Sequence, residues 1–597
     1  MILLAIVSAR RRQRRPQYRV YVSQGEQVLR QRRRRTLLVV VLVLLVVAAV
    51  AAVAAGTGQA QRLWTGVTGG ATQDTGNADR GGQGGGPQAG RLSLATASFP
   101  GPIAVDPPPP IKSGGDGVKV STFLGDETRR LYGLGPPPKS LGLIWRTFVG
   151  GGMTAPVRKV TKKHPNVPWS GSGWTGQPVI VREDGTLYLL WGAFDRKLHK
   201  IDLETGKVVW EYAFDDIIKS SPTVIEDPHP ADESDRYLVV AGSRRGWPSS
   251  YTDPALAPYR AVSFGTGKEV WRLPVPLTAS YSRDVDGSGF FFNGRLFSGV
   301  ESGWFYKLDP FETSSWNGHR TPKVLASRLL LGDPGDATAH GGNLVLEASP
   351  SLLGGVVYIS SGAGHIYGMR RSDLKVVWDY RTGSDLDGTP VPTKSGYLLC
   401  AVEKQYIRGH GGVLCLDPKK TGADAVRWFF PTGDRKLADW AGGVIGSVAV
   451  NDTYDPWGRR PRLAAFSAID GTLYVVAQDA KTGSKVPGPD LDGPYPTPKT
   501  VATFYLGGAI STPIMVDDTI VAAGYDNTVH LYKVKWRPAR KGDEGALRSP
   551  SGDWFTVRIT EKSAYAGGGA FESTPVMWKG RVFIGCRDGY LYCLGDR

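Results

Sequence analysis

Three short segments of this 597-residue chain place two aspartates and a glycine in a pattern that can hold a metal ion. They read Asp-Val-Asp-Gly at residues 284–287, Asp-Leu-Asp-Gly at 385–388 and Asp-Leu-Asp-Gly at 490–493. Paired carboxylates with glycine open the calcium loop of EF-hands, but none of the three continues with the further ligands and the distal glutamate of that loop. Aspartate and glycine also form ordinary turns. We therefore predict no metal site from these segments.

The other reactive side chains form no recognisable zinc or catalytic motif. The eight histidines are scattered, without His-x-x-x-His or Cys-x-x-Cys spacing, so a zinc site is not indicated. The chain has neither the Gly-x-Ser-x-Gly turn of serine hydrolases nor a Walker loop for phosphate. The four cysteines, Cys400, Cys415, Cys586 and Cys593, lie on neighbouring predicted strands. They either form disulfides, which an extracytoplasmic compartment permits, or are small buried apolar residues.

A repeated pattern of strands must position any chemistry that this chain performs. The clearest copy covers residues 198–210 and ends in a tryptophan, and similar stretches recur along the chain. Each leads into a loop and a signal of small residues before proline, such as Ser-Ser-Pro at 220–222 and Ser-Thr-Pro at 511–513. Asp-Gly and Asp-Asn dipeptides, which suit hairpin turns, separate short apolar strands. A period of about 40 to 60 residues made of such units predicts the blades of a propeller.

The strand signals predict an all-β fold with eight blades, and seven is the competing number. The last blade begins near Ala570 and has three strands before the chain ends at Arg597. The stretch at residues 141–148 carries a tryptophan but has no blade before it. We therefore predict that this N-terminal strand completes the C-terminal blade, which closes the ring and removes an exposed sheet edge.

The repeat resembles the pyrroloquinoline-quinone (PQQ)-type propeller repeat of quinoproteins. The stretch at 201–210 and its relatives carry the resemblance, with Tyr367 and Tyr592 in matching third-strand positions, over about residues 141–597. That class includes quinone-dependent dehydrogenases of alcohols and sugars, and also cofactor-free proteins such as the outer-membrane barrel-assembly propeller. The resemblance implies that five tryptophans dock neighbouring blades rather than stack on a ligand: Trp145, Trp210, Trp271, Trp378 and Trp428.

The N-terminal segment predicts a single membrane anchor. Residues 37–55 are nineteen apolar residues without a charge, and at about 1.5 Å per residue they span a hydrocarbon core of about 30 Å. Residues 1–36 hold eleven arginines and one glutamate, which is more than half of the net charge of +17. Positive residues stay in the cytoplasm, so we expect a basic cytoplasmic tail and an extracytoplasmic propeller. A cleaved signal peptide is the alternative, although its apolar region is usually shorter, about 7 to 15 residues.

The sequence therefore divides into four predicted parts. They are the cytoplasmic tail at 1–36, a transmembrane helix at 37–55, a Gly- and Pro-rich linker at 56–140 and the propeller at 141–597. Because the excess charge sits in the tail, nucleic-acid binding is not expected.

The predicted function is a binding or scaffolding platform for protein partners of the cell envelope, held at the cytoplasmic membrane. We expect no cofactor. The alternative is a membrane-attached dehydrogenase that uses PQQ with calcium. Enzymes of that kind usually show adjacent cysteines and a calcium ligand set, and neither is recognisable in this sequence. The absence of both favours a binding protein over an enzyme.

Overall fold

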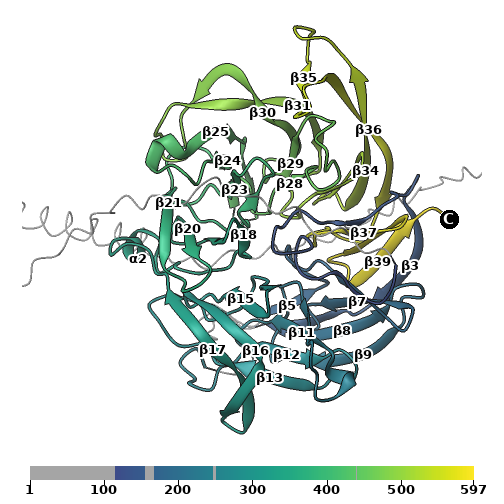
Figure 1. Cartoon of the computed structure of the whole chain (residues 1–597), viewed down its shortest axis with the longest axis vertical. Coiled ribbons are helices and arrows are strands. Elements are labelled where there is room, and N and C mark those ends of the chain that lie inside the picture. The colour runs from purple at the N-terminus through teal and green to yellow at the C-terminus, as the bar shows by residue number, and fades with distance from the viewer. Residues whose placement is uncertain (1–113, 155–166, 247–249, 439) are drawn as a thin grey trace, which may run out of the picture. The chain divides into compact units, whose positions relative to one another are not determined.

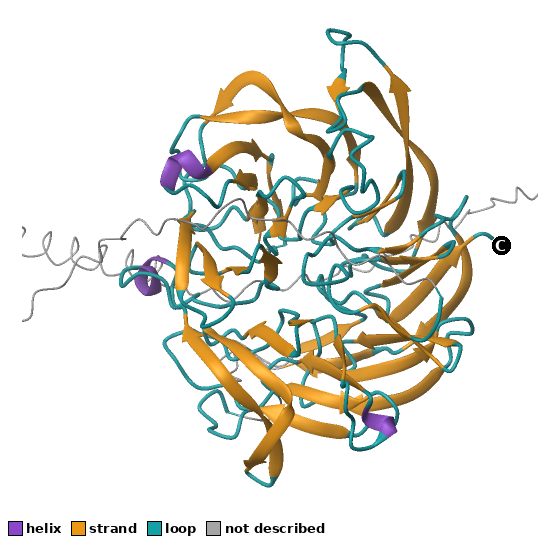
Figure 2. Ribbon diagram, viewed as in Figure 1, coloured by secondary structure: helices purple, strands orange, loops and turns teal. Residues whose placement is uncertain are grey.

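Eight antiparallel sheets follow one another around a central axis, as Figures 1 and 2 show. The computed structural model describes residues 114–154, 167–246, 250–438 and 440–597. The predicted eight-bladed propeller is thereby confirmed. The predicted tail, the apolar segment at 37–55 and most of the predicted linker lie outside the described residues. Within the described residues, no helix is long and apolar enough to cross a membrane.

Each of the first four blades consists of four antiparallel strands that run from the axis outwards. Blade one contains β6 (Val179–Glu183), β7 (Thr186–Gly192), β8 (Lys197–Asp202) and β9 (Val208–Ala213). Blade two contains β10 (Thr223–Glu226), β11 (Tyr237–Gly242), β12 (Tyr259–Ser263) and β13 (Glu269–Leu273). Blade three contains β14 (Phe290–Phe292), β15 (Arg295–Gly299), β16 (Trp304–Trp316) and β17 (His319–Leu329). Blade four contains β18 (Ser351–Leu353), β19 (Val356–Ser360), β20 (His365–Arg370) and β21 (Val376–Arg381).

The last four blades repeat this order, and the sheets of blades seven and eight each have a fifth strand. Blade five contains β22 (Val391–Pro392), β23 (Leu398–Val402), β24 (Gly412–Leu416) and β25 (Val426–Pro431). Blade six contains β28 (Ala449–Val450), β29 (Leu463–Ser467), β30 (Thr472–Val486) and β31 (Tyr495–Tyr505). Blade seven contains β32 (Ile514–Val516), β33 (Thr519–Ala523), β34 (Thr528–Pro538), β35 (Leu547–Arg548) and β36 (Trp554–Ala566). Blade eight contains β37 (Val576–Trp578), β38 (Arg581–Gly585), β39 (Tyr590–Gly595) and β3 (Gly142–Phe148).

A few short elements lie between the blades. They are the hairpins β4 (Gly151–Thr154) with β5 (Val167–Ser170) and β26 (Asp434–Leu437) with β27 (Trp440–Gly442), the helix α2 (Asp336–Ala339) and two 3-10 turns, Glu233–Asp235 and Gly422–Ala425. The third and fourth strands of blades three, six and seven are extended, and their hairpins project beyond the rim of the ring (Figure 1).

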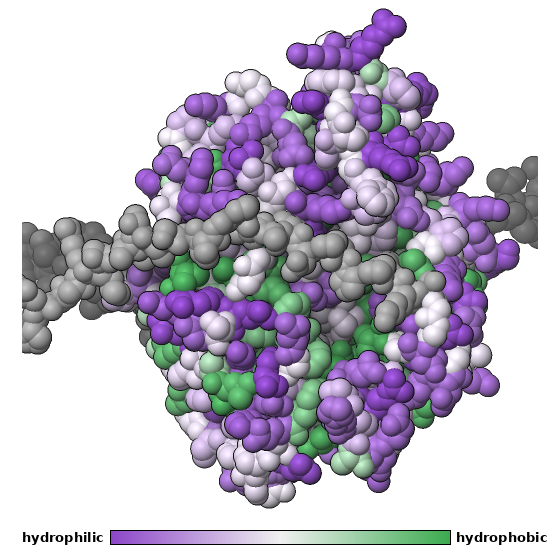
Figure 3. Space-filling view, in the orientation of Figure 1, coloured by the Kyte–Doolittle hydropathy of each residue, from purple (hydrophilic) through white to green (hydrophobic). Residues whose placement is uncertain are grey.

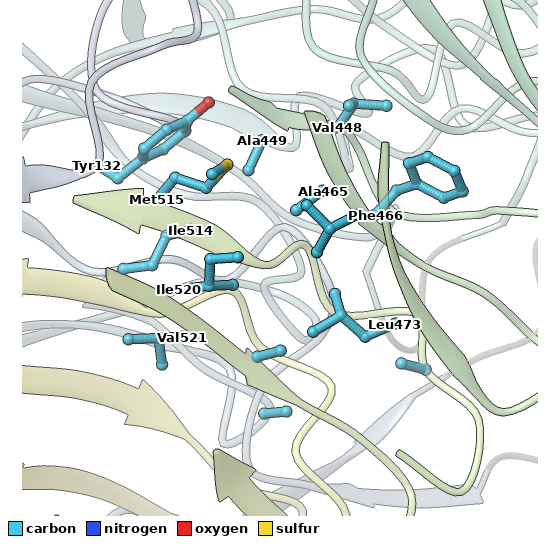
Figure 4. Packing of buried hydrophobic residues seen from close by; sticks show 14 of the residues in the cluster. Tyr132, Val448, Ala449, Ala465, Phe466, Leu473, Ile514, Met515, Ile520 and Val521 are labelled. Carbon is cyan, nitrogen blue, oxygen red and sulfur yellow. The ribbon is translucent and has the colours of Figure 1, made fainter. Parts of the chain in front are cut away.

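The burial of the strands explains their composition. The second strands β19 and β23 are buried along their whole length and are nearly continuous apolar runs, because neighbouring blades cover both faces of each sheet. The fourth strand β9 instead alternates between exposed and half-buried residues, as expected at the rim. Figure 4 shows the packing between blades six and seven, where Ala449 and Leu473 lie across from Met515 and Ile520.

The N-terminal strand closes the ring, as predicted. Strand β3 pairs antiparallel with β39 from Gly142↔Gly595 to Phe148↔Tyr590, so the first and last colours of Figure 1 lie side by side there. With β3 in place, β39 is paired on both sides, by β38 and by β3.

The propeller begins earlier than the boundary predicted at residue 141. Strand β1 (Gly117–Val120) pairs with β6 of blade one, and β2 (Gly133–Leu134) pairs in parallel with β37 of blade eight. We call residues 117–134 the axial segment, because they join the first strands of the blades. The guanidinium of Arg129 is fully buried and donates to the carbonyl oxygens of Pro350 at 2.7 Å and Ser288 at 2.8 Å. The end of the predicted linker is therefore part of the propeller core.

Candidate functional site

Adjacent blades are joined near the axis by hydrogen bonds between a backbone amide and a side-chain hydroxyl. The residue before proline in the small-residue signal, or its counterpart in blades three and six, supplies these groups. The bonds are Gln177 N to Ser221 Oγ at 2.9 Å, Ser221 N to Ser288 Oγ at 2.9 Å, Ser288 N to Ser349 Oγ at 2.9 Å, Thr389 N to Ser447 Oγ at 3.0 Å, Ser447 N to Thr512 Oγ1 at 2.8 Å and Thr512 N to Thr574 Oγ1 at 3.3 Å. We call this set the hydroxyl belt. It explains why serine and threonine recur in the signal.

The residue two positions before each belt residue lies at the end of the propeller where the first strands begin, which we call the upper end. These residues differ strongly from blade to blade. In blades two to eight they are Lys219, Asp286, Glu347, Asp387, Ile445, Ile510 and Glu572. One part of this ring is therefore charged, and blades six and seven contribute isoleucines that are almost fully buried.

Two groups of three carboxylates form on the charged part of the ring. In the first, Asp286, Glu301 and Glu347 bring one oxygen each to within 4.8 Å of one another. In the second, Asp385, Asp387 and Glu403 do the same. We call the six residues the axial acid cluster. Glu301 and Glu403 follow the second strands β15 and β23, and the other four precede first strands, so loops from blades three, four and five build the cluster.

Lys219 neutralises part of the first group. Its ammonium bonds to the carboxylate of Asp286 and lies 3.0 Å from Glu347 Oε1. Burial disfavours the charged lysine, but these carboxylates outweigh it and raise the pKa of Lys219 well above its usual value. Glu301 is 3% exposed, and its Oε1 has no hydrogen-bond partner among the described residues. Burial and the neighbouring Asp286 raise the pKa of Glu301 well above that of a free glutamate.

The second group is supported by amides. Asn343 Nδ2 donates to Asp385 Oδ2 at 2.6 Å, and Gln405 Nε2 donates to the same oxygen at 3.0 Å. The other oxygen, Asp385 Oδ1, is buried and has no partner in the described part of the chain. Burial, followed by the charge of Glu347, raises the pKa of Asp385 to about 7. Burial and the Asp385 charge also raise the pKa of Asp387.

Arginines and an aromatic side chain lie at the same end of the propeller. Arg244 Nε donates to Asp284 Oδ2 at 2.8 Å, and its guanidinium lies 5.9 Å from the ring of Trp169. The guanidinium of Arg587 lies 5.3 Å from the same ring and pairs with Glu572 at 2.8 Å. The upper end thus carries carboxylates over blades three to five and cation–aromatic contacts beside them. In Figure 3, hydrophilic residues cover most of the face in view.

Two of the three Asp-x-Asp-Gly segments lead into this cluster, and the third does not. Asp286, Asp385 and Asp387 belong to it. Asp490 instead pairs with Arg408 at 3.0 Å, and the Asp492 carboxylate accepts from Tyr495, both on an outer hairpin. The three glutamates of the cluster match no motif, because no sequence pattern joins them to the aspartates. Among the three glutamates, only Glu347 could have been found from the sequence, because it lies just before the small-residue signal.

The five predicted docking tryptophans each lie on the fourth strand of a blade and donate to a backbone carbonyl of the next blade. The bonds are Trp145 Nε1 to Leu203 O at 3.2 Å, Trp210 Nε1 to Phe264 O at 2.9 Å, Trp271 Nε1 to Pro310 O at 2.9 Å, Trp378 Nε1 to Lys420 O at 2.7 Å and Trp428 Nε1 to Gln478 O at 2.9 Å. Gly267, at φ +69°, passes so close to Trp210 that a Cβ there would lie 2.9 Å from the ring. None of the five belongs to the axial acid cluster.

The cysteines form no disulfide in the structure. Cys400 lies opposite Leu414, and Cys415 lies opposite Leu399, so the two thiols point to opposite faces of blade five. All four cysteines are buried and free. The sequence leaves both interpretations open, and the structure supports that of small buried residues. Burial raises the pKa of Cys586 and of Cys593 above the usual thiol value, as expected for unreactive thiols.

Three histidines in third strands lie in contact with neighbouring carboxylates. His199 lies 3.0 Å from Asp195, His365 lies 3.0 Å from Asp336, and His530 lies 2.9 Å from Asp526. Tyr474 and Tyr592 take the corresponding place in blades six and eight and donate to Asp470 and Asp588, both at 2.6 Å. We therefore interpret the contacts of His199 and His530 as a feature of the repeat that supports the turn before the third strand. His365 differs, because it begins β20 and contacts Asp336 of α2 and Asp379 of β21.

Comparisons with known proteins assign no family to the chain. No protein-family model matches it, and no curated protein matches it by sequence. Solved structures that it resembles include BamB from Moraxella catarrhalis, at 12% identity and a TM-score of 0.40, with coverage of 76% of this chain and 100% of the other. The quinohemoprotein alcohol dehydrogenase from Comamonas testosteroni shares 15% identity at a TM-score of 0.47, with 80% of each chain covered. A europium-containing methanol dehydrogenase shares 11% identity at a TM-score of 0.46, with 80% of this chain and 98% of the other covered.

The sheet order of the chain itself shows an eight-bladed β-propeller, as its repeat predicts. These resemblances concern the fold, and no site residue is transferred from them.

Proposed function

We propose that this protein is a membrane-tethered binding platform of the cell envelope and that the axial acid cluster, loaded with a divalent cation, is its ligand site. The observation that carries the proposal is the meeting of six carboxylates from three blades near the axis, where Lys219 pairs with two of them. Burying carboxylates without compensation is costly, because they must either take up protons or bind a cation. A bound cation would let these carboxylates stay ionised at neutral pH, and we propose this outcome.

The second group of carboxylates fits a calcium ion better than the first. Calcium takes six to eight oxygen ligands at about 2.3 to 2.6 Å, so two ligands of one ion lie within about 5 Å of each other. The oxygens of Asp385, Asp387 and Glu403 satisfy this condition, and Asp385 keeps a buried oxygen without a hydrogen bond among the described residues. In the first group, Lys219 already contacts both Asp286 and Glu347. A calcium ion held by the second group would offer its remaining positions to the oxygens of a ligand.

The membrane tether and the envelope location belong to the same proposal. They rest on the apolar run at 37–55 and the arginines before it. A propeller that is held beside a membrane can bind partners over its broad surface, and the cation site would give that binding a dependence on calcium.

A quinone-dependent dehydrogenase is the second candidate, because converging carboxylates and Arg244 lie at the same end of the propeller. A bound quinone would supply the redox chemistry itself, and the residues of this chain would hold the cation and orient the cofactor. The chain lacks adjacent cysteines.

Calcium titration of the full-length chain, purified in a mild detergent and followed by calorimetry, tests the proposal. We expect saturable binding in the wild-type chain and its loss in Asp387→Asn. Asp490→Asn, in the outer Asp-x-Asp-Gly segment, is the matched control and should bind like the wild type. Calcium binding without turnover supports the platform. Calcium-dependent binding of PQQ together with dye-linked oxidation of alcohols or sugars would establish the enzyme instead, and absence of calcium binding would refute the ligand site.

A further inference from the structure

A cavity of about 660 Å³ lies at the end of the propeller opposite the axial acid cluster, between blades six and seven. Its walls come from two places. One is the loop at residues 451–460 that follows the first strand β28, and the other is formed by the turn between β32 and β33 together with the strands β34 and β36. Because first strands end here rather than begin, we call this the lower end. The cavity therefore shares no residue with the axial acid cluster.

Two arginines form one wall of the cavity. Arg459 and Arg460 follow Asp455, whose carboxylate accepts from their backbone amides at 3.0 and 2.6 Å and so holds both on one turn. The guanidinium of Arg460 lies 5.0 Å from the ring of Phe555 and 5.9 Å from that of Trp536. Within the described ranges, neither arginine forms an ion pair. Two cationic groups thus face the cavity over an aromatic floor.

Carboxylates form the facing wall. Asp517 and Asp518 occupy the turn between β32 and β33, and Asp553 directly precedes β36. Asp518 Oδ1 accepts from Trp536 Nε1 at 2.6 Å, which fixes the indole against the cavity. Asp517 and Asp553 are exposed. Opposite charges therefore line one cavity and, within the described part of the chain, form no ion pairs across it.

We propose that this cavity binds a short peptide segment that carries a basic side chain and a carboxylate. Such a segment satisfies both walls at once, with its cation toward Asp517 and Asp553 and its carboxylate toward Arg459. The aromatic floor suits the apolar parts of a peptide. A volume of about 660 Å³ lies within the range of about 300 to 1,000 Å³ that is usual for ligand sites.

The balance of charge argues against a nucleotide or another polyphosphate. Four aspartates line the cavity, including Asp455, against two arginines. A ligand with several negative charges and none positive would be repelled by these carboxylates, while a ligand with both signs is accommodated. Trp457, in the same loop as the two arginines, is 76% exposed. Exposed aromatic side chains of this kind are typical of interaction surfaces.

The experiment uses the full-length chain in detergent and four pentapeptides of equal length, measured by calorimetry. They carry lysine and glutamate at their two ends, lysine only, glutamate only, or glutamine at both ends. We expect the mixed peptide to bind with a Kd of about 100 μM or tighter, and the glutamine peptide at least about tenfold more weakly. Equal binding of the mixed and the glutamine peptides would overturn the proposal, and so would tighter binding of ADP than of the mixed peptide.

Two single variants test which wall of the cavity binds which charged group of the peptide. Arg459→Gln should weaken the mixed and the glutamate peptides about three- to tenfold and leave the lysine peptide unchanged. Asp553→Asn should weaken the mixed and the lysine peptides and leave the glutamate peptide unchanged. Arg558→Gln, an exposed position on β36 outside the cavity, and Asp424→Asn, exposed in blade five, are the matched controls. Identical peptide affinities in all four variants would refute the proposed site, and circular dichroism melts check that each variant is folded.

Discussion

Removal of the docking tryptophans one at a time should reveal how strongly neighbouring blades hold each other. Trp271 is fully buried and donates to Pro310 O in the next blade. A buried tryptophan removes roughly 150 to 250 Å² from water, which at about 25 cal/mol per Å² corresponds to about 4 to 6 kcal/mol as an upper bound. We expect Trp271→Ala to lower the free energy of unfolding by about 3 to 5 kcal/mol.

A graded series separates the contributions. Trp271→Phe keeps most of the apolar contact but leaves the Pro310 carbonyl without its donor, so it should cost about 1 to 2 kcal/mol. Trp210 is only half-buried, and Trp210→Ala should cost less than Trp271→Ala, about 2 to 3 kcal/mol. Trp457→Ala is the control, because that ring is 76% exposed and its removal should change stability by about 0.5 kcal/mol or less.

Urea unfolding of the full-length chain, followed by circular dichroism and fluorescence, measures the series. Coincident transitions by the two probes are needed before free energies are compared, because a large propeller can unfold in steps. A loss of less than about 1 kcal/mol in Trp271→Ala, or a loss no larger than in Trp457→Ala, would refute the docking role. Such a result would instead favour the alternative role, in which the tryptophan ring stacks on a ligand.

Three further predictions address closure, pH and topology. Deletion of residues 141–149 removes β3 and leaves β39 unpaired, so we expect aggregation or a strongly lowered Tm, and a Tm equal to that of the full chain would show that β3 does not close the ring. Burial, followed by the charge of Asp126, raises the pKa of Glu127 from 4.5 to about 7. Because the folded state then binds this proton more tightly than the unfolded state, stability falls as pH rises from about 4.5 to about 7, and Glu127→Gln should raise the Tm at pH 8 but not at pH 4, as thermal melts at both values would show. A reporter that works only in the cytoplasm, fused after Arg597, should be inactive if the propeller is extracytoplasmic, and an active reporter would reverse the proposed orientation.

The features that follow from local pattern can be predicted from the sequence. Trp210 and its counterparts stand at a fixed place in each repeat, so the repeat alone assigns them to fourth strands. The strand at 141–148 can be predicted in the same way. The last blade has only three strands of its own in the sequence, and the stretch at 141–148 is a strand that belongs to no other blade. Both predictions use information within a single repeat or a count of repeats.

The axial segment is not predicted, because its composition resembles a linker. Residues 117–134 follow a Gly- and Pro-rich stretch, and their strands β1 and β2 are only four and two residues long. Their stability comes from pairing with β6 and β37 and from contacts such as Arg129 with Pro350, more than two hundred residues away. Periodicity within a short window contains no information about such partners.

The axial acid cluster escapes prediction for a related reason. Asp286, Glu347 and Asp387 come from three loops, and the packing of blades three, four and five against one another brings these loops together. Alignment of the repeats on the small-residue signal nevertheless places these three residues at one position, and they are the carboxylates of three consecutive blades there. Glu301 and Glu403 follow second strands. The small-residue signal lies before the first strand, so it cannot be used to align these two glutamates between repeats.

The hydroxyl belt explains how this fold can carry such a cluster at all. The belt joins blades through backbone amides and the hydroxyls of Ser288, Thr512 and their counterparts, so the residue two positions earlier is not needed for closure. Blades six and seven show this directly, because Ile445 and Ile510 occupy that position and their belt bonds are intact. The carboxylates of blades three to five are thus an addition that the architecture does not require. Since their burial opposes folding at neutral pH, a bound cation at this site would recover stability as well as create a place for a ligand.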